Sequence, residues 1–154
     1  AATMRTDVES AEEYINFWAT RYANAFGYRH EMMVEARKTR RIRCVDGGSI
    51  YMGKKPELPQ CANYPVQRAA LSVMARALIR HKRTLDDERS RGAHTKMIST
   101  IHDAIIDETL LADAGRCLML MRHDMTNAYL DIFPSAPIEG LVEGGCGTSW
   151  ANLE

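Results

Sequence analysis

The sequence lacks any apolar run approaching the roughly 20 residues that a membrane-spanning helix needs. Its first residues, Ala1 to Arg5, contain neither an apolar signal core nor a readable targeting motif. From these absences we expect no membrane partner. We also expect a cytoplasmic location, which would be the host cytoplasm for a viral protein.

Closely spaced cysteines are also missing. The four cysteines, Cys44, Cys61, Cys117 and Cys146, lie far apart in the sequence. No two of them have the short spacing of a zinc knuckle or a redox motif. The pattern therefore favours buried free thiols in a reducing compartment.

Internal repeats, low-complexity segments and flexible linkers are absent as well. The 154 residues are enough for one compact domain, and a hydrophobic content of 45% can supply its core. We therefore expect a single domain over residues 1–154.

Neither sign of charge is in excess, because 20 Lys and Arg side chains balance 20 Asp and Glu side chains. The distribution is uneven, however. Residues 1–96 hold 18 basic and 11 acidic side chains, whereas residues 97–154 hold 2 basic and 9 acidic ones. A basic half suits a polyanion and an acidic half suits bound cations. A dipolar surface with neither role is the alternative.

Helical and strand patterns both occur along the chain. Thr6 and Glu9 fit a capping box before a first helix that reaches about Tyr22. Apolar periodicity predicts further helices over residues 24–38, 65–83 and 110–129. Alternation and turn signals predict a hairpin over residues 41–52, two strands at 95–101 and 104–107, and a last strand at 138–143. Residues 53–60 are expected to form a loop and residues 84–92 an exposed connection. The prediction is a mixed α/β (α+β) domain.

His102 and Asp103 fall between the two strands of the second predicted pair. A carboxylate on a tight turn is held rigidly and can reach metal ions. Aspartate is also common in turns that have no such role. The spacing alone leaves both interpretations open.

Three segments occur in an order that matches a known family. They are Asn63-Tyr64-Pro65-Val66-Gln67 opening a long helix, Ile101-His102-Asp103 inside an apolar hairpin, and Val142-Glu143-Gly144-Gly145-Cys146-Gly147-Thr148-Ser149-Trp150 near the end. In order and spacing they resemble the family-A DNA polymerases of the bacterial polymerase I type. The resemblance runs from about Glu9 to Trp150.

The resemblance implies the C-terminal palm part of a DNA-directed DNA polymerase, with an antiparallel sheet packed against long helices. The family's first motif and its fingers helix lie upstream of this region and are not found in these 154 residues. The implied fold is therefore incomplete without an upstream partner, and the chain is a fragment or a split subunit that is inactive alone. The implied partners are a DNA primer–template, a deoxynucleoside triphosphate and the upstream polymerase segment.

Nucleotidyl transfer with two Mg²⁺ ions requires hard oxygen ligands. The resemblance implies that Asp103 is the catalytic metal ligand and that His102 is catalytic and contacts the primer end of the DNA. A turn or core histidine is the alternative for His102. Ala104 stands where the family usually has a glutamate. A second carboxylate is therefore expected from the missing segment.

Asn63 and Gln67 are four residues apart, so both can lie on one face of a helix. The resemblance implies that they hydrogen-bond the minor groove near the primer end. The alternative for Asn63 is a helix cap. Arg68 replaces a usual glycine, and it either reaches a DNA phosphate or crowds the site.

Two other function classes remain open from the residues alone. A metal phosphohydrolase of the HD type would use His81 or His94, then His102-Asp103 and Asp124, on an all-helical scaffold. A non-catalytic nucleic-acid-binding or scaffold domain would suit Ala104 and the missing upstream half. Asp107 and Glu108 are expected to be solvated strand charges.

Overall fold

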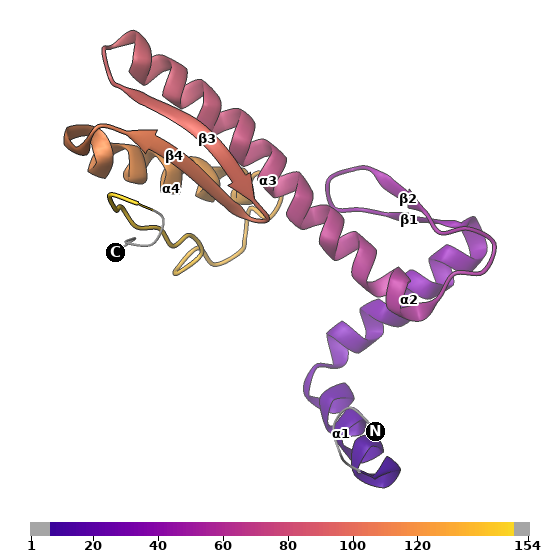
Figure 1. Cartoon of the computed structure of the whole chain (residues 1–154). Coiled ribbons are helices and arrows are strands. Elements are labelled where there is room, and N and C mark those ends of the chain that lie inside the picture. Colours follow the sequence, from indigo (N-terminus) through magenta and orange to yellow (C-terminus); the bar gives the residue numbers. More distant parts are fainter. Residues whose placement is uncertain (1–6, 150–154) are drawn as a thin grey trace. The chain divides into compact units, whose positions relative to one another are not determined.

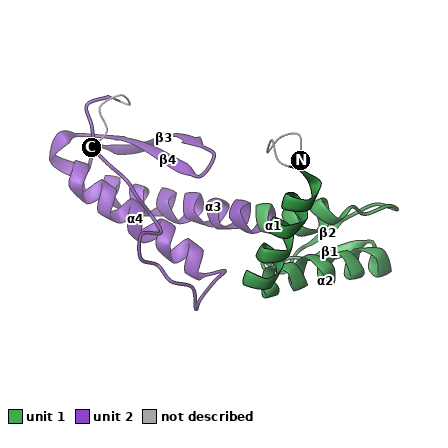
Figure 2. Ribbon diagram, turned by 90° about the horizontal axis from the view of Figure 1, so that it is seen from below, with its two compact units in different colours: residues 1–67 green, residues 68–154 purple. Residues whose placement is uncertain are grey.

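The structure is a computed structural model that describes residues 7–149. Its internal contacts group into two compact units, residues 1–67 and residues 68–154 (Figure 2). The expectation of a single domain stays a prediction. In the described part of the chain, no helix is both long enough and apolar enough to cross a membrane.

The first unit holds two helices and a short hairpin (Figure 1). Helix α1 spans Val8–Arg21 and α2 spans Ala23–Thr39. The N-cap of α1 is Asp7, which accepts a 2.7 Å hydrogen bond from the backbone N–H of Ser10. The predicted cap, Thr6, lies outside the described residues.

The predicted first hairpin is confirmed. Strands β1 (Arg41–Arg43) and β2 (Ser49–Tyr51) pair antiparallel, with Ile42 opposite Ile50. Gly47 takes a φ of +83° in the connecting turn, a conformation that glycine adopts without steric cost. A small core closes this unit, formed by Ala36, Ile42, Met52 and Cys61.

Helix α3 spans Leu58–Ser90 and is longer than predicted at both ends. The expected loop stops at Glu57, and the expected connection over residues 84–92 is wrong because the helix continues to Ser90. Ion pairs of Asp86 with Lys82 and with Arg89 stabilise this charged turn at helical spacing. Leu85 is only 1% exposed, so this segment packs against the core.

The second unit contains the predicted strand pair with its tight turn. Strands β3 (Thr95–Ile101) and β4 (Ala104–Thr109) pair antiparallel, with an irregularity between Met97 and Ser99. A 3₁₀ turn over Leu111–Asp113 leads into helix α4, which spans Ala114–Leu130. The hairpin lies against α3 and α4 (Figures 1 and 2). The core between them is formed by Met74, Ala77, Ile105 and Ala128.

The predicted last strand over residues 138–143 is wrong. This segment is irregular, and each of the two sheets in the described residues has two strands only. Gly140 has a φ of +67°. The N–H of Leu141 donates a 3.2 Å hydrogen bond to the carbonyl of Ile138, which closes a turn. The chain therefore bends where a strand would have to stay extended. The mixed α/β prediction, with antiparallel strands and long helices, is confirmed.

Candidate active site

The turn between β3 and β4 consists of His102 and Asp103 alone, and Ile101 pairs with Ala104 across it. His102 has a φ of +54°, the sign found at the first position of two-residue hairpin turns, where glycine is usual. A non-glycine residue there stores strain of order 1–3 kcal/mol. Both side chains are exposed. The turn thus presents an imidazole and a carboxylate to solvent from a rigid base.

Asp103 offers a hard anionic oxygen of the kind that Mg²⁺ prefers. Its neighbour Ala104 offers no ligand atom. Within residues 7–149, Asp103 is not part of any group of three side chains that could hold an ion. Asp103 can therefore supply one ligand of a magnesium site, and the neighbouring residues do not supply the others.

Asn63 and Gln67 lie one turn apart on α3, and both are exposed. The helix begins at Leu58, so Asn63 is inside it and the alternative of a helix cap is wrong. Arg68 follows on the same helix and is half-buried. Asn63 and Gln67 belong to the first unit, whereas the His102–Asp103 turn belongs to the second.

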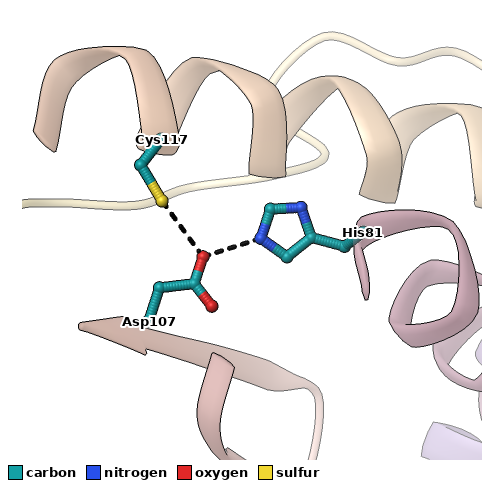
Figure 3. A group of neighbouring side chains, drawn as sticks. All are labelled: His81, Asp107 and Cys117. Carbon is teal, nitrogen blue, oxygen red and sulfur yellow. Dashed lines mark hydrogen bonds and ion pairs between the residues drawn. The ribbon is translucent and has the colours of Figure 1, made fainter. Parts of the chain in front are cut away.

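A buried polar cluster was not predicted. It contains His81 of α3, Asp107 of β4 and Cys117 of α4 (Figure 3), together with Asp124 of α4. His81 is fully buried, with Nε2 2.7 Å from Asp107 Oδ2 and Nδ1 2.9 Å from Asp124 Oδ2. The Cys117 thiol donates a 3.2 Å hydrogen bond to the same oxygen of Asp107.

The prediction of a solvated Asp107 is therefore wrong, since its side chain is only 4% exposed. Two signals pointed inward. Asp107 follows the buried Ile105 by two residues and so shares its strand face. His81 continues the buried stripe of Met74, Ala77 and Leu85 on α3. Glu108, by contrast, is exposed as predicted, and its Oε1 lies 3.0 Å from Lys96 Nζ.

Burial and the two neighbouring carboxylates have opposite effects on the pKa of His81. Burial lowers the pKa of His81, but the hydrogen bonds and charges of Asp107 and Asp124 outweigh it, and the pKa is raised above 6.5. The two neighbouring carboxylates thus favour the protonated imidazole more than water does. Burial also raises the pKa of the Cys117 thiol to about 11.

The closing segment packs against α4 at Gly144. A side-chain carbon added at Gly144 would lie 2.7 Å from Leu118 Cδ1, so only glycine fits there without a shift. Arg122 Nη2 donates a 2.8 Å hydrogen bond to the Gly144 carbonyl. Trp150, the end of the motif, lies outside the described residues.

Comparison with known proteins identifies the family of the chain. The family model described as "DNA polymerase family A" matches residues 1–152. This chain belongs to DNA polymerase family A. The alternative of an HD-type hydrolase also fails on structure, because it needs His102-Asp103 on a helix and they lie between two strands.

Among solved structures, the family-A chain is similar to the "POL domain of Pol1 from M. smegmatis complex with DNA primer-template and dNTP". The TM-score is 0.75 at 21% sequence identity, over 84% of this chain. This likeness supports the fold. The chain spans 24% of that polymerase chain, and no curated protein sequence matches it.

Proposed function

We propose that this chain is the C-terminal palm part of a DNA-directed DNA polymerase, either a fragment or one subunit of a split enzyme. The observation that carries the proposal is Asp103, exposed at the tip of the β3–β4 turn in a chain of the polymerase family. The substrates would be a DNA primer–template and a deoxynucleoside triphosphate.

Two Mg²⁺ ions, when bound, would neutralise charge on the phosphates of the incoming nucleotide. Asp103 supplies one anionic oxygen ligand from this chain. His102 adjoins it on the turn and positions the primer end. The remaining carboxylate comes from the upstream segment, because Ala104 cannot provide it.

The contacts to the primer–template come from the helix that carries Asn63 and Gln67. Their exposed amides suit the hydrogen-bond acceptors of the minor groove, which all base pairs share, so such contacts test pairing geometry rather than sequence. Arg68 adds a positive charge for a phosphate.

The upstream polymerase segment is the proposed protein partner. Large apolar side chains of α1 are exposed, namely Tyr14, Ile15, Phe17 and Trp18. The two-stranded sheet of β3 and β4 also has unpaired edges. Exposed apolar surface and open strand edges favour association with another segment.

Mixing the purified chain with its upstream segment, each expressed separately, tests the proposal. We expect templated primer extension by the mixture with Mg²⁺, and none by either part alone. A mixture that associates and binds primer–template without extending it would instead favour a non-catalytic remnant, as Ala104 would suit. The cytoplasmic location also stays a prediction.

A further inference from the structure

The His81–Asp107–Cys117 cluster brings three different donor types together inside the second unit. One ligand atom from each residue lies within 4.8 Å of the others. They come from α3, β4 and α4, so the cluster joins all the elements that build this core. Imidazole nitrogen, carboxylate oxygen and thiol sulfur form the mixed donor set that Zn²⁺ and Co²⁺ accept, whereas Mg²⁺ prefers oxygen alone.

The second nitrogen of His81 is already held by a carboxylate. Asp124 Oδ2 lies 2.9 Å from Nδ1, and the Asp124 side chain is only 5% exposed. In metal sites, the ligating histidine donates its other N–H to such a carboxylate, which fixes the tautomer and turns the free nitrogen toward the ion. Asp124 thus orients Nε2 toward Asp107 and Cys117.

The Asp107 carboxylate of this cluster also has an unsatisfied oxygen. Asp107 Oδ1 is buried and has no hydrogen-bond partner among the described residues. Leaving a buried carboxylate oxygen unpaired costs free energy unless something binds it. A cation that both oxygens of Asp107 bind, beside Nε2 and Sγ, would satisfy it.

We propose that His81, Asp107 and Cys117 bind one zinc-class divalent ion, with Asp124 as the positioning residue. The ion crosslinks α3, β4 and α4 and stabilises the second unit. This proposal goes beyond the polymerase function and is independent of it, because none of these residues lies on the His102–Asp103 turn.

The hydrogen-bond distances within the cluster correspond to the site with protons where the ion would bind. Nε2 and Sγ lie 2.7 Å and 3.2 Å from Asp107 Oδ2. Donors around a tetrahedral zinc ion at 2.0–2.3 Å are roughly 3.3–3.8 Å apart. These two distances to Asp107 Oδ2 therefore need to grow by about 1 Å or less. The ion replaces the proton on Nε2 and the proton on Sγ, which are released to solvent.

Cobalt titration of the full chain, stripped of metal by EDTA, tests the site. Binding through Cys117 should give a thiolate-to-Co²⁺ charge-transfer band that saturates near one equivalent and is removed by added Zn²⁺. Zn²⁺ should also raise the midpoint of thermal unfolding, whereas Mg²⁺ at the same concentration should not. These readouts need no polymerase activity.

Variants locate the ion. Cys117→Ser should abolish the charge-transfer band, and His81→Gln should weaken Co²⁺ binding at least about 100-fold. Asp124→Asn should keep the band but weaken binding roughly 10–100-fold, as expected for a carboxylate behind a ligand. Two matched controls outside the ligand set, Cys44→Ser and His30→Gln, should bind Co²⁺ like the parent.

Measurements on the parent chain are enough to refute the proposal, so the test does not depend on whether every variant folds. Folded parent chain that gives neither the charge-transfer band with Co²⁺ nor a thermal shift with Zn²⁺ has no such site. A band that persists in folded Cys117→Ser and disappears in Cys44→Ser would also refute it.

Discussion

At the β3–β4 turn, a histidine holds a backbone conformation that glycine usually takes. The φ of +54° at His102 is one of two positive values among the non-glycine residues of the described chain, the other being at Arg40. Arg40 ends α2, where a left-handed residue is ordinary. His102 has no such structural reason, since glycine would serve the turn better. The strain is consistent with an imidazole that is needed beside Asp103.

Replacing His102 by glycine should therefore stabilise the isolated chain. We expect His102→Gly to raise the free energy of unfolding by about 0.5–1 kcal/mol, because the relieved strain exceeds the added entropy of the unfolded state. His102→Ala is the matched control, since it removes the imidazole but keeps the strain. Urea unfolding of the three proteins measures this. Equal or lower stability of His102→Gly relative to His102→Ala would show that the turn is unstrained.

A second residue-scale prediction concerns Glu88, whose side chain is 9% exposed and is bound by Arg116. The hydrogen bond from Arg116, helped by its charge and by Arg91, holds the pKa of Glu88 below its ordinary value of 4.5. A lowered carboxylate pKa adds stability that is present above the unfolded pKa and is lost as pH falls through the folded one.

The parent should accordingly lose stability as pH falls below about 4.5, and Glu88→Gln should lose less over that range. Urea midpoints at a series of pH values from neutral to acid compare the two. Parallel pH profiles for parent and variant would mean that the Glu88–Arg116 pair does not contribute to this dependence.

Sequence reasoning at the residue scale succeeded where the signal was local and failed where it depended on packing. Asp103 was placed on a tight turn because two β-branched runs flank it. For Asp107 the sequence favours a solvated strand charge, because four residues along a strand place it too far from the turn to act there. Only the pairing of β4 with α3 and α4 brings His81 and Asp124 to its side, and no local pattern encodes that meeting.

At the scale of elements, the strands β1 to β4 and all four helices follow patterns that the sequence predicts, but the ends of α3 do not. The run after Arg83 is rich in charge, which predicts an exposed connection. Ion pairs around Asp86 and the burial of Leu85 keep it helical. The predicted strand at residues 138–143 does not form. Alternating apolar residues are not enough for a strand, because a strand also needs a neighbour to pair with.

The exposed face of α3 carries a prediction for the assembled polymerase. If Gln67 contacts the minor groove, Gln67→Ala should slow extension by roughly 5–150-fold, equivalent to about 1–3 kcal/mol, at unchanged stability. Val66→Ala, an exposed neighbour on the same helix, is the control and should extend normally. Single-turnover extension and thermal unfolding together measure this. A parental rate for Gln67→Ala would make Gln67 a surface residue without a role in DNA contact.

At the scale of the whole molecule, the uneven distribution of charge bears on the proposed polymerase role. The chain spans 24% of the similar polymerase chain, and residues 97–154, which include Asp103, hold only 2 basic side chains against 9 acidic ones. Such a field favours cations near the turn. Residues 1–96 hold 18 of the 20 arginines and lysines, whose positive charge suits the DNA backbone. This uneven charge suits the proposed roles, in which one part of the chain binds metal and the other binds nucleic acid.

The most direct measurement is single-turnover primer extension by the assembled polymerase carrying Asp103→Asn, together with a primer–template titration at fixed salt. The amide keeps the size of the side chain but removes the charge that a magnesium ligand needs. We expect nearly all synthesis to be lost while primer–template binding stays largely intact, because phosphate contacts supply most of that affinity. Extension within about tenfold of the parent, roughly 1.4 kcal/mol, would show that Asp103 is not a catalytic metal ligand.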